Sequence, residues 1–208
     1  IARNLRILIN NNINNISIVV GYHKEKLIEH VKSSFPKIRI TFIDNDEYLK
    51  KENIFSVWCA KNEFNNNLVM MDADLIFNDH IIKKIIGCND ENFIVVRKEV
   101  HENEMIVLMK NNKVIELSKN PIIQDIDFDN MYESVGIIKL SKVAAISLIN
   151  EISIFVKNNN LNQYYEAGIN QLFDSINFSI LMMDSLSIVE ELDSVNDIAR
   201  LKSSKLTL

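Results

Sequence analysis

The stretch LVMMDAD, residues Leu68 to Asp74, decides the fold class. Four apolar residues in a row, followed closely by two acidic side chains, are typical of a short strand that is buried on both faces and ends at a polar edge. Strands of this kind occur in parallel sheets that helices cover on both sides. We therefore expect a β-strand here, with Asp72 and Asp74 at its carboxyl end.

The residues around this strand alternate between strand and helix patterns. ISIVVGY (Ile16–Tyr22) and IRITFID (Ile38–Asp44) are runs rich in β-branched residues. Helical patterns occupy residues 1–10, 24–35, 53–64 and 79–86. Asp79 is the candidate N-cap of the last of these helices. The order strand, helix, strand predicts a mainly parallel sheet built from right-handed crossovers.

The pattern changes after residue 92. Short β runs follow, some separated by hairpin-like Asn turns: NFIVVRK, EMIVLMKNN, KVIELSK and YESVGIIKL. The acidic stretch NPIIQDIDFDN (residues 120–130) is expected to be a loop or flap. Two helices at about residues 142–156 and 163–175, a strand in FSILMMD and a terminal helix complete the chain. We expect one mixed α/β domain over residues 1–208, its mainly parallel sheet flanked by helices, with residues 97–135 as a β insertion.

Composition excludes several classes of protein. The chain has 208 residues, of which 47% are apolar, so one α/β domain with a sizeable core is expected. Its formal net charge of −5 argues against a general nucleic-acid binder. We see no signal peptide and no run long enough to span a membrane, and we expect a cytoplasmic protein. Cys59 and Cys88 are far apart without metal-type spacing and are interpreted as free thiols.

Acidic side chains stand at two places where they could carry chemistry. Asp72 and Asp74 lie two residues apart at a strand end, so both project from the same side if the strand is regular. In open α/β sheets ligands bind at such carboxyl ends, and carboxylates suit Mg²⁺. The second place is EELDSVND, where Glu191 and Asp193 follow a short apolar run. Each motif alone is as well explained by capping of a loop or helix, and only their order favours a site.

Six segments, taken in order, resemble one family. They are NISIVVGYHKEKLIEHV, NDEYLKKENIFSVWCA, VMMDADLIF, YESVGIIKLS, YYEAGINQL and EELDSVNDIARL. The set is similar to the nucleotidyltransferase superfamily with its GT-A-like fold, and most of all to its phosphocholine cytidylyltransferase-like branch. The resemblance covers nearly the whole chain, and it implies a Rossmann-like nucleotidyltransferase fold.

The resemblance also implies roles for individual residues. Asp74 and Asp193 match the metal ligands of the family, with Mg²⁺ as the cofactor. Asp72, Lys119 and Glu191 match catalytic positions that assist the metal, face phosphate or orient the site. The remaining candidates would bind substrate: Asn53, Ser56, Arg97, Glu104, Glu133, Tyr164 and Tyr165. Residues 97–135 would then lie on the acceptor side of the site.

The implied reaction is an in-line attack by an acceptor phosphate or phosphonate oxygen on the α-phosphorus of a nucleoside triphosphate, CTP in this branch, with release of pyrophosphate. Phosphocholine and aminoethylphosphonate are open choices of acceptor. Met105 stands where choline-handling relatives tend to carry an aromatic ring, whereas Glu102, Glu104 and Glu133 could meet an amine. Neither nucleic acid nor membrane is expected as a partner, and a homodimer is left open.

One family feature is missing from the sequence. The family begins with a strand and a Gly-rich loop that cradles the triphosphate through backbone N–H groups. The four glycines of this chain are isolated, and residues 1–10 match the helix that follows the loop. We therefore expect a fold without the first strand and this loop. Two alternatives to the cytidylyltransferase remain: a sugar-1-phosphate nucleotidylyltransferase, and a non-catalytic binding relative. An upstream Gly-rich segment in the intact gene product would favour an enzyme.

Overall fold

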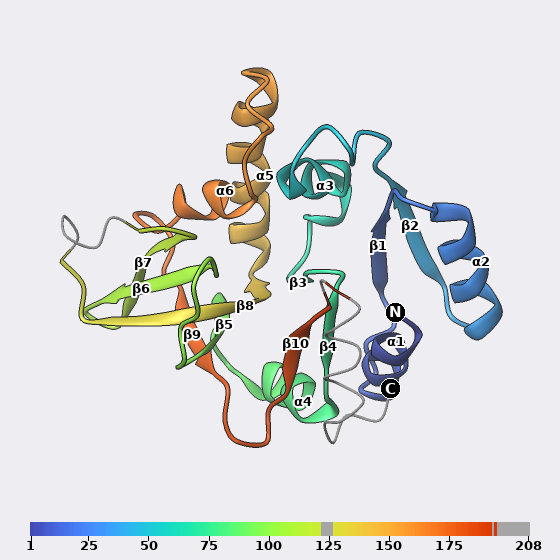
Figure 1. Cartoon of the computed structure of the whole chain (residues 1–208), viewed down its shortest axis with the longest axis horizontal. Coiled ribbons are helices and arrows are strands. Elements are labelled where there is room, and N and C mark those ends of the chain that lie inside the picture. Colours follow the sequence, from blue (N-terminus) through green and yellow to red (C-terminus); the bar gives the residue numbers. More distant parts are fainter. Residues whose placement is uncertain (122–126, 193, 195–208) are drawn as a thin grey trace.

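The first part of the chain forms a small parallel sheet with helices around it. A computed structural model describes residues 1–121, 127–192 and 194, and Figure 1 shows the arrangement of the elements. The elements of this first part are α1 (Ala2–Asn10), β1 (Ile16–Val20), α2 (Lys24–Ser34), β2 (Ile40–Asp44) and α3 (Asn53–Cys59). β1 pairs in parallel with β2 through the α2 crossover, which confirms the strand–helix–strand interpretation.

The rest of the chain contributes most of the strands. These later elements are a 3₁₀ turn (Lys61–Glu63), β3 (Leu68–Met71), β4 (Leu75–Phe77), α4 (Asp79–Gly87), β5 (Phe93–Arg97), β6 (Ile106–Lys110), β7 (Lys113–Ser118), β8 (Asn130–Leu140), α5 (Lys142–Lys157), α6 (Glu166–Asn170), β9 (Ser179–Met182) and β10 (Val189–Glu191). The turn between β6 and β7 is the expected Asn hairpin, because Asn111 and Asn112 both adopt positive φ, at 50° and 61°.

The central sheet has the strand order β7-β6-β8-β5-β9, and β3 pairs with the carboxyl-terminal part of β8, residues 137–140. The mixed α/β class is confirmed, with helices on both sides of the sheet (Figure 1). The proportion of parallel strand pairs is lower than in the mainly parallel sheet that the sequence predicts. Within the described residues only β1–β2 and β5–β9 are parallel pairs, while β8 is antiparallel to β3, β5 and β6. β3 does not pair with β1 or β2 in this part of the chain.

The sheet separates two apolar clusters, and β5 shows how. Alternate residues of a strand point to opposite faces. Ile94 and Val96 belong to a cluster that α3, α5 and α6 cover, whereas Phe93 and Val95 belong to a second cluster with α4. All four side chains are fully buried. A strand that is apolar on both faces, as NFIVVRK is, therefore fits a central position in the sheet.

Several expected boundaries shift. The strand expected to reach Asp74 ends at Met71, and a turn at Ala73 and Asp74 separates it from β4. The N-cap of α4 is Asn78, whose side chain accepts a hydrogen bond from Ile81 N, so the prediction of Asp79 was wrong. The expected terminal helix and part of the acidic flap lie outside the described residues. No helix in the described ranges is long and apolar enough to cross a membrane.

Candidate functional site

The carboxyl end of β3 carries the two aspartates that the sequence singles out. The strand ends at Met71 and a turn follows, so the condition under which both side chains would project from the same side, a regular strand up to Asp74, is not met. Asp72 is half-buried against β8, while Asp74 lies in the turn and is exposed. The two carboxylates are still close enough for the charge of Asp74 to act on Asp72.

A bulge in β8 makes room for Asp72. The register between β5 and β8 shifts between Ile94 and Val96, and Gly136 lies in the affected part of β8 with a positive φ of 69°. Gly136 O accepts a hydrogen bond from Asp72 N at 3.0 Å. A Cβ at Gly136 would lie only 2.5 Å from Asp72 Oδ2. Only glycine tolerates both the positive φ and this approach, so Gly136 fixes where Asp72 lies.

Behind Asp72 lies a second buried carboxyl, that of Glu166. The Tyr165 side chain forms hydrogen bonds with both carboxyl groups. Tyr165 and Glu166 are only 3% and 7% exposed. Burial raises the pKa of Glu166 to about 7. Burial, followed by the negative charges of Glu166, Asp74 and Glu191, raises the pKa of Asp72 to about 7 as well. The ionised form of both carboxyls is therefore disfavoured at this end of the sheet.

β10 brings Glu191 to the same place. This strand pairs antiparallel with β4, with Glu191 opposite Leu75, the residue after Asp74. Leu192 N donates to Asp74 O at 3.1 Å. The predicted partner of Asp74, Asp193, lies outside the described residues. Within the described ranges, no three His, Cys, Asp or Glu side chains form a group that could hold a metal. The charges of Asp74 and Glu191 both act on Asp72, and of the predicted metal pair the structure describes only Asp74.

Lys119 and Tyr164 lie beside the buried carboxyls. Lys119 Nζ is 4.9 Å from the centre of the Tyr164 ring, and its charge also acts on Glu166. Tyr164 is 40% exposed, whereas its neighbour Tyr165 is buried. The sequence suggested both tyrosines as walls of a substrate pocket. Tyr164 has the exposure of such a wall, and Tyr165 instead forms part of the interior.

The predicted acceptor-side residues form a second group along β5 and β8. Arg97 Nε lies 3.3 Å from Glu133 Oε1 without hydrogen-bond geometry, and Arg97 donates from an Nη atom to Val189 O at 2.9 Å. Glu133 also accepts from the backbone N–H of His101, at 2.8 Å. Glu133 is only 4% exposed, so an acceptor could reach it only by displacing these contacts. Glu104 is half-exposed, two residues before Ile106, which pairs with Glu133.

Asn53 and Ser56, both on α3, join separate parts of the site region. Asn53 Oδ1 accepts from Tyr165 N at 2.8 Å and so ties the start of α3 to the tyrosine that contacts Asp72. Ser56 Oγ accepts from the buried Asn45 at 3.0 Å, after the end of β2. Both residues are half-buried, and the side-chain oxygen of each accepts a hydrogen bond from another part of the protein.

The sequence interpretation missed two residues of this region. Glu166 was quoted only as part of a family-like segment, and its burial next to a tyrosine follows from tertiary packing. Glu166 Oε2 has no hydrogen-bond partner within the described part of the chain. Gly136 could have been found, because a glycine inside an apolar strand pattern often marks a bulge or a close approach of another group.

The chain has similar sequences among known proteins, and one of them is a cytidylyltransferase. The chain is 26% identical to a choline-phosphate cytidylyltransferase of Haemophilus influenzae, over 95% of this chain and 80% of that protein. It is 34% identical to the bifunctional protein GlmU of Methanococcus maripaludis, over 54% of this chain but only 26% of that longer protein. No family model matches the sequence.

Solved structures give the same picture at the level of the fold. The CTP:phosphocholine cytidylyltransferase of Streptococcus pneumoniae superposes with a TM-score of 0.70 at 20% identity, over 96% of this chain and 82% of that one. A putative glucose-1-phosphate thymidylyltransferase of Bacillus anthracis reaches 0.72 at 12% identity, over 99% and 82%. These matches show the fold, and the sequence relationship to the choline-phosphate cytidylyltransferase supports a nucleotidyltransferase, an enzyme of the cytidylyltransferase-like type.

Proposed function

We propose that the protein transfers CMP from CTP to a small phosphorylated acceptor, such as phosphocholine or aminoethylphosphonate, with release of pyrophosphate. The observation that carries this proposal is the relationship over 95% of the chain to a choline-phosphate cytidylyltransferase. The carboxylates at the ends of β3 and β10 support it, because they lie where α/β sheets bind ligands. No covalent intermediate with the protein is required.

We propose Mg²⁺ as the metal, held by Asp74 and Asp193 with Asp72 and Glu191 beside them. The residue types support this choice, because Mg²⁺ prefers carboxylate oxygens together with phosphate and water. The raised pKa of Asp72, caused by burial and then by the charges of Glu166, Asp74 and Glu191, supports a cation at this place. When bound, the metal would neutralise charge on the triphosphate.

The chain's own residues would position the two substrates. Lys119, beside the exposed ring of Tyr164, supplies a cation that could face a phosphate. Arg97 is fixed by Glu133 and Val189 O, so its guanidinium keeps one orientation on the acceptor side. Alignment of an acceptor oxygen with the α-phosphorus is the main contribution that such fixed groups make to the rate. We propose residues 97–135 as the acceptor-side part of the domain.

A sugar-1-phosphate nucleotidylyltransferase is the second candidate. One observation favours it: the putative glucose-1-phosphate thymidylyltransferase shares the fold of this chain with a TM-score of 0.72. In that reaction the acceptor presents hydroxyl groups instead of an amine or quaternary ammonium. Exposed acidic side chains such as Glu104 could accept hydrogen bonds from hydroxyls as well as from an amine.

Partners and compartment follow from simpler observations. Cys59 and Cys88 are both free thiols, which supports a reducing compartment, and we propose the cytoplasm. The net charge of −5 supports a small-molecule substrate over nucleic acid as partner.

A panel of substrates tests this proposal. The intact gene product would be incubated with CTP, UTP, GTP, ATP or dTTP, and with phosphocholine, aminoethylphosphonate or glucose 1-phosphate, while pyrophosphate release is measured. We expect CTP with an amino or choline-type acceptor to give the highest rate, and EDTA to abolish it. A clear preference for a sugar phosphate would favour the second candidate. Pyrophosphate release from none of the pairs would contradict both.

A further inference from the structure

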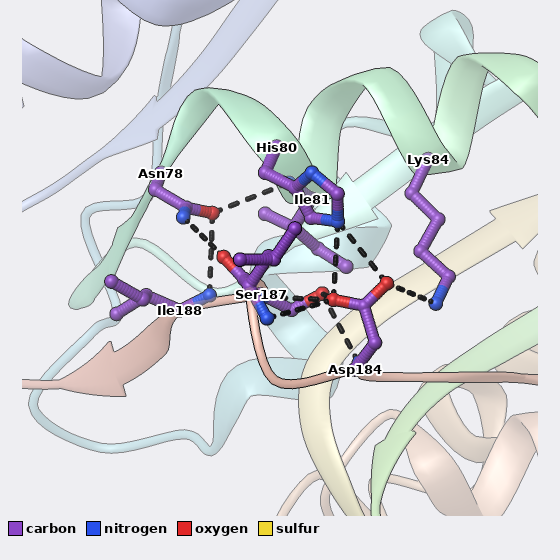
Figure 2. A network of polar contacts seen from close by, with 8 residues as sticks. Asn78, His80, Ile81, Lys84, Asp184, Ser187 and Ile188 are labelled. Atoms are coloured by element: carbon purple, nitrogen blue, oxygen red, sulfur yellow. Dashed lines mark hydrogen bonds and ion pairs between the residues drawn. The ribbon is translucent and has the colours of Figure 1, made fainter.

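The loop between β9 and β10 is tied to α4 through one carboxylate, that of Asp184. Figure 2 shows the group. His80 Nε2 lies 3.1 Å from each carboxylate oxygen, and Lys84 Nζ lies 3.0 Å from one of them. The same carboxylate accepts hydrogen bonds from the loop's own Leu186 N at 3.1 Å and Ser187 N at 3.0 Å. Asp184 therefore folds the loop and attaches it to a helix about 100 residues away in the sequence.

Asn78 makes the second attachment, at the start of β10. Its Nδ2 donates to Leu186 O at 2.7 Å, and its Oδ1 accepts from Ile188 N at 3.2 Å. Its backbone N–H donates to Ile188 O at 3.1 Å. The same Oδ1 also caps α4 by accepting from Ile81 N at 3.3 Å. One side chain thus fixes both the first turn of α4 and the residue that precedes β10 (Figure 2).

β10 needs such support. It has three residues and pairs only with β4 in the described sheets, which also has three residues. An isolated pair of strands is at best marginally stable in water. A shift of one residue would turn every side chain of β10 to the opposite face. The pairing also places Glu191 near Asp74, and two carboxylates at short range repel each other. The contacts of Asp184 and Asn78 can offset both effects.

We propose that Asn78 and Asp184 are positioning residues that hold β10 in register on β4 and thereby keep Glu191 and Leu192 beside Asp74. The catalytic consequence rests on the proposed function, but the register itself does not. The hydrogen bonds from His80, Lys84 and Ser187 hold the pKa of Asp184 well below its usual range, which shows that these partners stabilise the ionised carboxylate. Neither residue touches a substrate in this account.

Two conservative variants test the proposal. Asp184→Asn keeps the shape of the side chain but removes the charge between His80 and Lys84. Asn78→Asp keeps the oxygen that caps α4 and loses the donor to Leu186 O, so the helix retains a good N-cap. The control is Lys83→Met, on the same helix, which removes only the exposed 2.5 Å pair with Asp79. All three would be made in the intact gene product and compared with the parent protein.

The first measurement is amide hydrogen exchange. Ile188 N and Leu192 N donate the hydrogen bonds that report on the two ends of β10. Loss of one charged or neutral hydrogen bond should speed their exchange about tenfold in each variant. The amides of β5 and β8 should exchange as in the parent, and Lys83→Met should change none of them. Unchanged exchange at Ile188 and Leu192 in both variants would overturn the proposal, whatever the protein's activity.

The second measurement is the Mg²⁺ dependence of pyrophosphate release. We expect the Mg²⁺ concentration for half-maximal rate to rise about tenfold in Asp184→Asn and Asn78→Asp, because the carboxylates no longer converge. A merely structural role would lower the amount of folded enzyme without moving this concentration. If exchange is faster in the variants but their Mg²⁺ dependence equals that of the parent, the proposed effect of the β10 register on catalysis is overturned. If the parent protein itself shows no transfer, the proposed function fails, and the exchange data alone decide the register.

Discussion

Two groups of carboxyls in this protein sit in opposite electrostatic environments. Asp72 and Glu166 share the buried Tyr165, and burial is the main cause that raises the pKa of each to about 7. Asp184 is 42% exposed and lies between His80 and Lys84, and its hydrogen bonds lower its pKa. The same chemical group is thus destabilised in its charged form at one end of β3 and stabilised in the loop before β10.

The difference teaches what each group can do. A tyrosine hydroxyl has one proton, so it can donate to only one of two ionised carboxylates. Asp72, Tyr165 and Glu166 are therefore fully satisfied only when one carboxyl carries a proton or when a cation lies nearby. Asp184 has its donors already in place. Buried carboxyls with raised pKa values, such as Asp72 and Glu166, are typical of functional sites. A carboxylate that already has its donors, such as Asp184, is typical of a structural contact.

The largest effect should come from Asp74→Asn in the intact gene product. If the acidic group at β3 carries the chemistry, removal of this charge should reduce pyrophosphate release about 10³-fold, by analogy with the loss of a transition-state contact. Asp184→Asn and Asn78→Asp should lose far less of this activity. Asp174→Asn serves as the control, because Asp174 is an exposed aspartate that follows α6 in the sequence. This variant should keep the parent rate. Near-normal turnover in Asp74→Asn would remove the basis for the metal assignment.

The next largest effect should come from Gly136→Ala, which changes the backbone position that lies against Asp72. The added Cβ would lie 2.5 Å from Asp72 Oδ2, and the positive φ of 69° strains any L side chain. We expect a loss of about 2–4 kcal/mol in the free energy of unfolding, together with weaker transfer. Denaturant unfolding measures the first quantity. Gly87→Ala is a matched control, because a Cβ there meets nothing within 4 Å. Equal stability of the two variants would show that the bulge tolerates a side chain.

The sequence predicts the scaffold of this site better than its interior. Apolar runs with an abrupt acidic end, as in LVMMDAD, predict a strand and the sheet edge at which α/β proteins bind ligands, because burial and chain direction are local properties. The acidic motif EELDSVND points to Glu191, and the resemblance to the family adds Lys119. The pairing of Asp72 with Glu166 could not be predicted, because it joins residues 94 positions apart through one tyrosine. Asn78 was missed because Asp79, an equally good cap, follows it directly.

The smallest effect, and the most direct test of the contrast, is the pH dependence of stability. Glu166 has a pKa of about 7 in the folded protein, raised from 4.5. Between these values the folded state binds more protons than the unfolded state, so the free energy of unfolding falls as the pH rises from about 4.5 to 7. Glu166→Gln cannot ionise and should lose this fall, gaining on the order of 1–3 kcal/mol relative to the parent between pH 5 and pH 8.

Asp184→Asn should behave in the opposite way. The pKa of Asp184 is lowered, so its contribution is present above its unfolded value and is lost as the pH falls through acid. Relative to the parent, this variant should be destabilised at neutral pH and converge with it in acid. Salt should weaken the difference, because Asp184 is exposed, and should leave the effect of Glu166→Gln nearly unchanged. Denaturant unfolding at pH 2, 4, 6 and 8, in low and high salt, measures both variants, and only the lowest pH lies below the ordinary pKa of 3.8, where the contribution of Asp184 is lost. Parallel pH profiles for the two would mean that the carboxyls do not differ in the way their surroundings imply.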